Sequence, residues 1–201
     1  MDSEDMKTIE SLMKLFVQAL EYLYDKERDI IKRDVNERCM AAITFAFMKS
    51  KWNRCKRLRP YQLDYEYNRE GQNGVPKRLY CKYAEDKKTK WHLIIPDLIV
   101  HVRGDVSGKR NLCVIEFKKF GIDPTDDIVK LEEMTRQDNE GKFRYEFGLH
   151  VVFGESLDAT KFEVFINGQS IEEQQIGADV GELISMIGGC VKKSHANAVG
   201  F

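Results

Sequence analysis

One ten-residue stretch, NLCVIEFKKF at 111–120, constrains the fold of this chain more than any other part of it. Successive residues of a β-strand point to opposite faces of a sheet, so Leu112 and Val114 would lie on one face. Cys113 and Ile115 would lie on the other face. A strand that is apolar on both faces needs cover on both sides. The stretch therefore predicts a buried strand in a sheet that has helices on each face.

The rest of the sequence predicts its clearest helices and strands in the order α-α-β-β-β-α-β-β-α, and a further short strand could cover 79–83. Apolar residues recur at helical spacing near the N-terminus, and turn-forming residues separate the later apolar runs. The fold class is thus α/β, with a mixed central β-sheet flanked by helices. The predicted helices cover 5–24, 34–52, a segment from 123 to a stop at 141, and 178–189; the predicted strands cover 62–70, 79–83, 91–104, 112–118, 146–154 and 161–168.

We divide the chain into an N-terminal helical extension at 1–33, an α/β core at 34–190 and a loosely ordered tail at 191–201. The sequence is 42% apolar and 32% charged, which is typical of a soluble globular protein. No apolar run approaches the ~20 residues that span a bilayer, so we expect no membrane partner. The acidic N-terminus is unlike a signal peptide, and the five cysteines form no CxxC pair. We therefore expect a cytoplasmic protein with reduced thiols.

Two charged residues, Glu116 and Lys118, share one face near the end of the apolar strand. Another carboxylate, Asp97, follows Pro96 in the preceding strand of a predicted hairpin. If its turn centres on 106–107, antiparallel pairing places Asp97 opposite Glu116, with Cβ atoms about 4.5–5.5 Å apart. Like charges in that position are destabilising unless a cation lies between them. Two carboxylates suit Mg²⁺, for which Mn²⁺ could substitute, and Lys118 could then act on an attacking water.

Two simpler readings stay open. Glu116 and Lys118 could form an ordinary ion pair at a strand end, with Asp97 as an unrelated charge. Glu37 lies on or beside the apolar stripe of the predicted 34–52 helix, so it either reaches the polar site or remains at the edge of that face.

Basic residues are concentrated in one part of the chain, since residues 49–90 carry a net charge of +8. This segment is either a solvated helix end and loop or a surface that contacts nucleic-acid phosphates. The densest part, 49–59, contains Lys49, Lys51, Arg54, Lys56, Arg57 and Arg59.

In the order of its elements and in these motifs the chain resembles the PD-(D/E)xK nuclease superfamily, whose fold is called restriction-endonuclease-like. Glu37 matches the helical glutamate of that family, Asp97 its PD element, and Glu116 with Lys118 its ExK element. The resemblance covers roughly 34–155. More narrowly the chain is similar to a group of uncharacterised bacterial and phage proteins, through the segments NER, DYEYNR, PKRL, IIPDLIVHVRG, NLCVIEFKK and DDIVKL.

The resemblance implies a set of roles for the residues at the site. Asp97 and Glu116 would hold Mg²⁺, and the backbone carbonyl of Phe117 would add a ligand. Lys118 would work on the water, and Glu37 would help to hold the metal or the water. The implied function is a metal-dependent nuclease that hydrolyses phosphodiester bonds, with DNA as the expected substrate.

Two other functions remain open. One is a catalytically inactive nuclease-fold module that binds nucleic acid or a protein partner, and the other is an unrelated metal enzyme. A homodimer or a partner protein could add specificity.

Four further residues have weaker signals. Asp64 and Glu66 share a strand face and either border the site or belong to an exposed surface. We expect Lys130 to form a solvated pair with a residue one helical turn earlier, Asp126, with contact to the substrate backbone as the alternative. His101 would lie about 13 Å from Asp97 along a strand, so we expect it to be structural.

Overall fold

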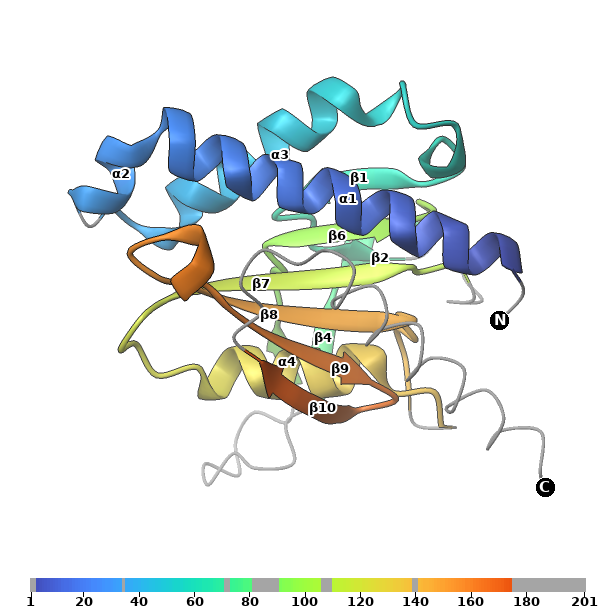
Figure 1. Ribbon diagram of the computed structural model, residues 1–201. Coiled ribbons are helices and arrows are strands. Elements are labelled where there is room, and N and C mark those ends of the chain that lie inside the picture. The colour runs from blue at the N-terminus through green and yellow to red at the C-terminus, as the bar shows by residue number, and fades with distance from the viewer. Residues whose placement is uncertain are drawn as a thin grey trace.

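A six-stranded mixed sheet forms the middle layer of the protein (Figure 1), and the computed structural model describes residues 3–33, 35–70, 73–80, 91–105, 110–138 and 141–174. The predicted helix at 178–189 and the predicted tail at 191–201 lie outside the described residues. Only β7 and β8 run parallel; the other neighbouring strands of this sheet are antiparallel. In spatial order its strands are β1 (Gln62–Tyr65), β6 (Leu98–His101), β7 (Cys113–Lys119), β8 (Phe147–Phe153), β9 (Lys161–Ile166) and β10 (Gln169–Gln174).

Helices cover both faces of this sheet, which confirms the predicted α/β class with a flanked mixed sheet. α1 (Ser3–Lys26) and α3 (Glu37–Trp52) lie on one face, and α4 (Thr125–Thr135) lies on the other (Figure 1). The short α2 (Arg28–Lys32), which the sequence did not predict, follows α1. Two 3₁₀ turns complete the helical elements, η1 (Lys56–Leu58) and η2 (Leu157–Ala159).

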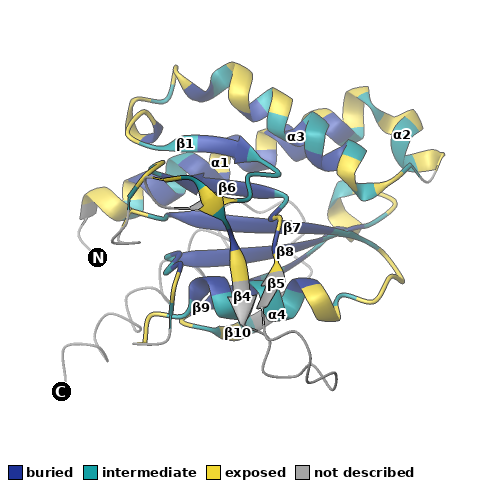
Figure 2. Cartoon of the chain, turned by 180° about the vertical axis from the view of Figure 1, so that it is seen from behind, coloured by how far each residue is buried: buried dark blue, intermediate teal, exposed yellow. Residues whose placement is uncertain are grey.

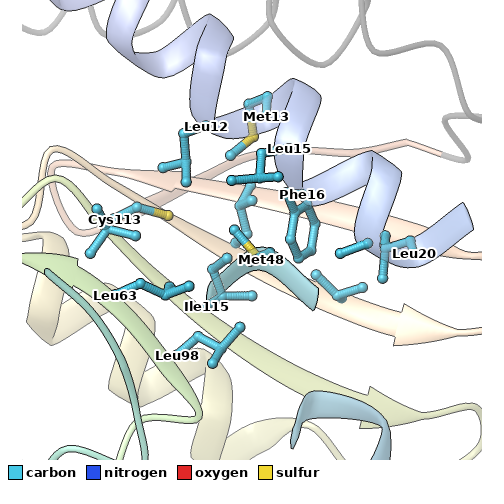
Figure 3. Packing of buried hydrophobic residues seen from close by; sticks show 14 of the residues in the cluster. Leu12, Met13, Leu15, Phe16, Leu20, Met48, Leu63, Leu98, Cys113 and Ile115 are labelled. Carbon is cyan, nitrogen blue, oxygen red and sulfur yellow. The ribbon is translucent and has the colours of Figure 1, made fainter. Parts of the chain in front are cut away.

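The larger part of the core lies between the sheet and the pair α1 and α3 (Figure 3). Phe16 of α1 is fully buried and contacts Phe117 of β7, with ring centroids 6.2 Å apart. Phe117 in turn stacks on Phe153 of β8 at 5.2 Å. Cys113 is buried in the same cluster, whereas Cys39 is half-buried. The odd-numbered residues of β7 therefore anchor α1 and α3, which leaves its even-numbered residues for the α4 face.

A small arm lies on the α4 side of the sheet (Figure 2). It contains two two-stranded sheets, one of β2 (Arg69–Glu70) with β3 (Val75–Pro76) and one of β4 (Arg78–Tyr80) with β5 (Trp91–Leu93). The predicted strands at 62–70 and 91–104 are each wrong as single strands, because each divides between the main sheet and this arm. The first breaks at Glu66, whose φ is 47°, and the second breaks around Pro96, which has no N–H to donate.

Other predicted boundaries shift less. α4 ends at Thr135, ahead of the predicted stop at Gly141, and β10 was not predicted. The hairpin register is confirmed, because Leu98 pairs with Ile115 and Val100 pairs with Cys113, as a turn centred on 106–107 requires.

Leu131 fixes α4 on the sheet. Its side chain is fully buried, and replacing it with alanine should lower the free energy of unfolding by about 2–5 kcal/mol. Leu93 is 55% exposed, so the same change there should alter stability by no more than about 0.5 kcal/mol. Urea unfolding of Leu131→Ala and Leu93→Ala measures the difference, and equal losses would contradict this account of α4.

Candidate active site

Asp97 and Glu116 lie side by side at one end of the β6–β7 pair. Continuing the observed register by one residue beyond Leu98 and Ile115 places the two carboxylates directly opposite each other. Asp97 Oδ2 accepts a hydrogen bond of 2.8 Å from the backbone N–H of Phe117. The carbonyl of Asp97 accepts from the N–H of Glu66 at 3.0 Å, which extends the pairing of β1 with β6 to the site. The two residues that the sequence predicted as metal ligands are thus brought together.

Glu116 is almost completely buried, with 1% of its surface exposed. Oε2 accepts a hydrogen bond of 2.8 Å from Lys130 Nζ, whereas Oε1 is buried and has no hydrogen-bond partner among the described residues. Burial raises the pKa of Glu116 well above its usual value; the charges of Asp97 and Asp127 act in the same direction, and Lys130 opposes them. Burial also raises the pKa of Asp97. Burial therefore disfavours the ionised form of both carboxyls, and a nearby cation favours it.

Two lysines supply positive charge to this cluster. Lys118 Nζ lies 2.5 Å from Asp127 Oδ2, and Lys130 Nζ lies 3.3 Å from Asp127 Oδ1. Burial alone would lower the pKa of each lysine, but the neighbouring carboxylates outweigh it and hold both pKa values above the ordinary range. For Lys118 the carboxylate that matters most is Asp127, and for Lys130 it is Glu116. Asp127 therefore joins the two ammonium groups on the α4 face of the sheet.

Glu37 reaches the same end of the sheet from the opposite layer. It is the first residue of α3, whose N-cap Asn36 accepts a hydrogen bond from the backbone N–H of Arg38 at 2.9 Å. The Tyr65 hydroxyl donates to the carbonyl of Arg38 at 3.1 Å and so ties this helix start to β1. Glu37 is half-buried, and its charge contributes to the raised pKa of Lys118. It thus belongs to the electrostatic surroundings of Lys118.

Sequence reasoning missed Asp127 and misplaced Lys130. The expected solvated pair of Asp126 with Lys130 is wrong: Asp126 is exposed, whereas Lys130 contacts Glu116 and Asp127. Thr125 begins α4, and its backbone N–H and hydroxyl both donate to Asp123 Oδ1, at 3.0 and 2.7 Å. Asp127 lies four residues before the buried Leu131 on the apolar stripe of α4, and that spacing could have identified it.

The donor set fits Mg²⁺ as the resemblance implies. This ion is commonly held by one or two carboxylates and retains several waters, and Asp97 with Glu116 would be that pair. Glu116 Oε1, without a hydrogen-bond partner among the described residues, is available as a ligand. Within the described ranges no three His, Cys, Asp or Glu side chains are arranged to hold a metal, so the backbone carbonyl of Phe117 and water would complete the coordination.

The basic segment lies away from this cluster. The basic side chains lie at the C-terminal end of α3, in η1 and in the turns on either side of η1, and all but the half-buried Lys51 are exposed; they are Lys49, Lys51, Arg54, Lys56, Arg57 and Arg59. Arg57 forms an ion pair of 3.2 Å with Glu4, and Lys49 donates to the carbonyl of Leu63 at 2.9 Å. Since Glu37 begins the same helix, about 22 Å of helix separates the basic segment from the site.

Asp64 and His101 form a buried pair, so Asp64 does not belong to an exposed surface. Asp64 Oδ2 lies 2.9 Å from His101 Nε2, and Asp64 also pairs with Arg103. Burial would raise the pKa of Asp64, but its hydrogen bonds to His101 and Arg103 outweigh this and hold the pKa well below its usual value. Burial lowers the pKa of His101, and its structural role is confirmed by this pairing.

The lowered pKa of Asp64 makes a prediction about acid stability. Its contribution to folding is fully present above its unfolded pKa of about 3.9 and is lost as the pH falls toward the folded value. Asp64→Asn should therefore lower stability by about 1–3 kcal/mol at pH 7 and flatten the decline of stability below pH 4. Urea unfolding from pH 7 to pH 2 tests this, with the exposed Asp126→Asn as a control; an unchanged acid limb would contradict it.

Comparisons with protein-family models, with curated proteins and with solved structures gave no match to this chain. In the described part of the chain, no helix has the length and apolar character needed to cross a membrane.

Proposed function

We propose that this chain is a metal-dependent nuclease with a restriction-endonuclease-like core, which hydrolyses phosphodiester bonds in nucleic acid, with DNA as the expected substrate. The observation that carries the proposal is the juxtaposition of Asp97 and Glu116 in the predicted register, with two lysines in the same buried cluster. A purely structural ion pair needs one carboxylate and one cation, whereas here three carboxylates surround two ammonium groups.

Each residue would have a distinct part in this reaction. Asp97 and Glu116 would hold the metal, and the Phe117 N–H fixes the Asp97 carboxylate in position. When bound, Mg²⁺ would polarise the phosphoryl group and lower the pKa of a coordinated water. Lys118 would stabilise charge on the phosphoryl oxygens and orient the attacking water, and Glu37 would orient that lysine or the water.

One observation favours a second candidate, the catalytically inactive nuclease-fold module. Lys118 forms an ion pair with Asp127 at 2.5 Å, and Lys130 forms one with Glu116, so these charges are already partly neutralised without a metal. Such a module would bind nucleic acid or a protein partner and would not hydrolyse it.

Metal binding and turnover should separate when the two ExK residues are changed. Glu116→Gln should lose both Mn²⁺ binding and cleavage, because it removes a ligand charge. Lys118→Ala should keep Mn²⁺ affinity but lose turnover by about 10²-fold or more, since its contribution is made in the transition state. Calorimetry with Mn²⁺ and a cleavage assay on single-stranded, duplex and branched DNA and on RNA measure the two effects.

The matched control is Lys14→Ala, which removes an exposed lysine of α1 and should change neither quantity. Both measurements belong at pH 8 as well as pH 7, because ligand carboxyls with raised pKa values bind metal better as the pH rises. Nucleic-acid binding by the wild-type chain without cleavage of any substrate would instead support the inactive module.

The basic segment should contribute to affinity only for long substrates. About 22 Å of helix separates it from the site, which is roughly six nucleotides at ~3.4 Å per phosphate. Changing Lys51, Arg54 and Lys56 together to Glu should reduce the salt dependence of binding by about 0.7–0.9 for each lost phosphate contact. A tetranucleotide should show no such change, and an unchanged slope for long substrates would mean that the segment is only a solvated surface.

A further inference from the structure

A pocket of about 240 Å³ lies beside the candidate active site, on the face of the sheet that α4 covers. Its volume is below the ~300–1,000 Å³ typical of pockets for drug-sized ligands, so it would suit a smaller group. It is lined by Pro124 and Ile128 at the start of α4, by His150 and Val152 of β8, and by Lys161, Phe162 and Glu163 of β9.

The pocket continues directly from the carboxylate cluster. Glu116 of β7 pairs with His150 of β8, which pairs with Glu163 of β9, so these three side chains form one row across the sheet. Neighbouring strands are about 4.8 Å apart, which puts His150 one strand and Glu163 two strands from Glu116. A group in the pocket would therefore lie roughly 5–10 Å from Glu116.

Polar groups are buried at the floor of this pocket. His150 is 3% exposed, and its Nδ1 lies 3.7 Å from Glu163 Oε2. His150 Nε2 is buried without a hydrogen-bond partner among the described residues. The Ser170 hydroxyl donates to Glu163 Oε1 at 2.5 Å and so holds that carboxylate in place. A buried nitrogen without a partner is uncommon in natural proteins and is often explained by function.

Apolar side chains complete the surroundings. Ile128 and Val152 give the pocket apolar walls. The connection from β7 to α4, which supplies Pro124, also carries Phe120, 75% exposed, and Ile122, 51% exposed. An exposed aromatic side chain is a surface on which an unpaired base can stack.

We propose that this pocket receives one base of a single nucleic-acid strand whose neighbouring phosphate lies at Asp97 and Glu116, an inference that rests on the proposed function. A base has two apolar faces and a polar edge, which match Ile128 and Val152 on one hand and His150 and Glu163 on the other. In an intact duplex the bases are stacked and paired, so that entry would require unstacking. The site therefore favours single-stranded over duplex substrate.

The test is a scan with single-stranded DNA in which one base at a time is removed to leave an abasic sugar. Binding to the full chain is measured by fluorescence anisotropy without metal, so that no cleavage intervenes. One abasic position should weaken binding by about tenfold, the usual effect of losing one stacked base. Val152→Phe fills the pocket and should bind the intact strand about tenfold more weakly. Removing the base at the sensitive position should then cause no further loss of affinity.

Two other variants make the result specific. Val102→Phe makes the same change at a half-buried position outside the pocket and should bind as the wild type does. Glu163→Gln keeps the volume of the pocket, and it replaces Val152→Phe in the test if circular dichroism shows that Val152→Phe does not fold. It should also reduce the loss of affinity that the abasic sugar causes at that position.

The outcomes separate this inference from the proposed function. Three results would overturn the base pocket, whether or not the wild type cleaves DNA. They are an abasic scan in which every position has the same affinity, no binding of single-stranded DNA, and a scan that gives the same result in Val152→Phe and Glu163→Gln as in the wild type. An abasic position that weakens binding in the wild type but not in Val152→Phe would support the base pocket. If in that case no substrate were cleaved with Mn²⁺, only the nuclease activity would be refuted.

Discussion

The buried carboxylate of Glu116 is the constraint on which this end of the structure depends. A lone carboxylate there would lose several kcal/mol of hydration, so it needs a hydrogen-bonded cation or a proton. Lys130 provides that cation at 2.8 Å, and it can do so only if α4 begins near Thr125 and lies across β7 and β8. Gly148 of β8 permits this approach, because a Cβ at that position would come within 3.0 Å of Leu131. The burial of Glu116 therefore requires the position of α4, the glycine in β8 and the charge of Lys130 together.

The same cluster leaves negative charge that the lysines do not balance. Among the described residues, the carboxylates of Asp97, Glu116 and Asp127 share this cluster with the ammonium groups of Lys118 and Lys130. Burial is the main cause of the raised pKa values of Asp97 and Glu116, and the neighbouring carboxylates add to it. The cluster can remove the unbalanced charge in two ways, by taking up a proton or by binding a further cation. Because these alternatives exclude each other at Glu116 Oε1, a metal would bind in competition with protons.

Local signals predicted more of this site than tertiary ones. The pairing of Asp97 with Glu116 could be predicted because a short hairpin fixes its own register. The role of Lys130 could not, because it depends on which face of α4 meets the sheet, and the nearby Asp126 offered an apparently sufficient partner. Predicting 91–104 as a single strand failed for a similar reason: the Ile94 N–H bonds to the carbonyl of Lys77 in the arm, a contact distant in sequence. The register of a hairpin can thus be predicted from the sequence, whereas the docking of a helix cannot.

The order of the strands places four side chains of the site and the pocket in one row across the sheet. Asp97 on β6, Glu116 on β7, His150 on β8 and Glu163 on β9 succeed one another across the sheet, so the row spans about 14 Å at ~4.8 Å per strand. A nucleic-acid strand that followed this row would cross the β-strands and occupy roughly four nucleotides at ~3.4 Å each. The basic end of α3 lies on the other face of the sheet, at the far end of the helix that Glu37 begins. In the proposed nuclease, the residues that hold the reacting phosphate and those that add general affinity would therefore contact different nucleotides of one strand.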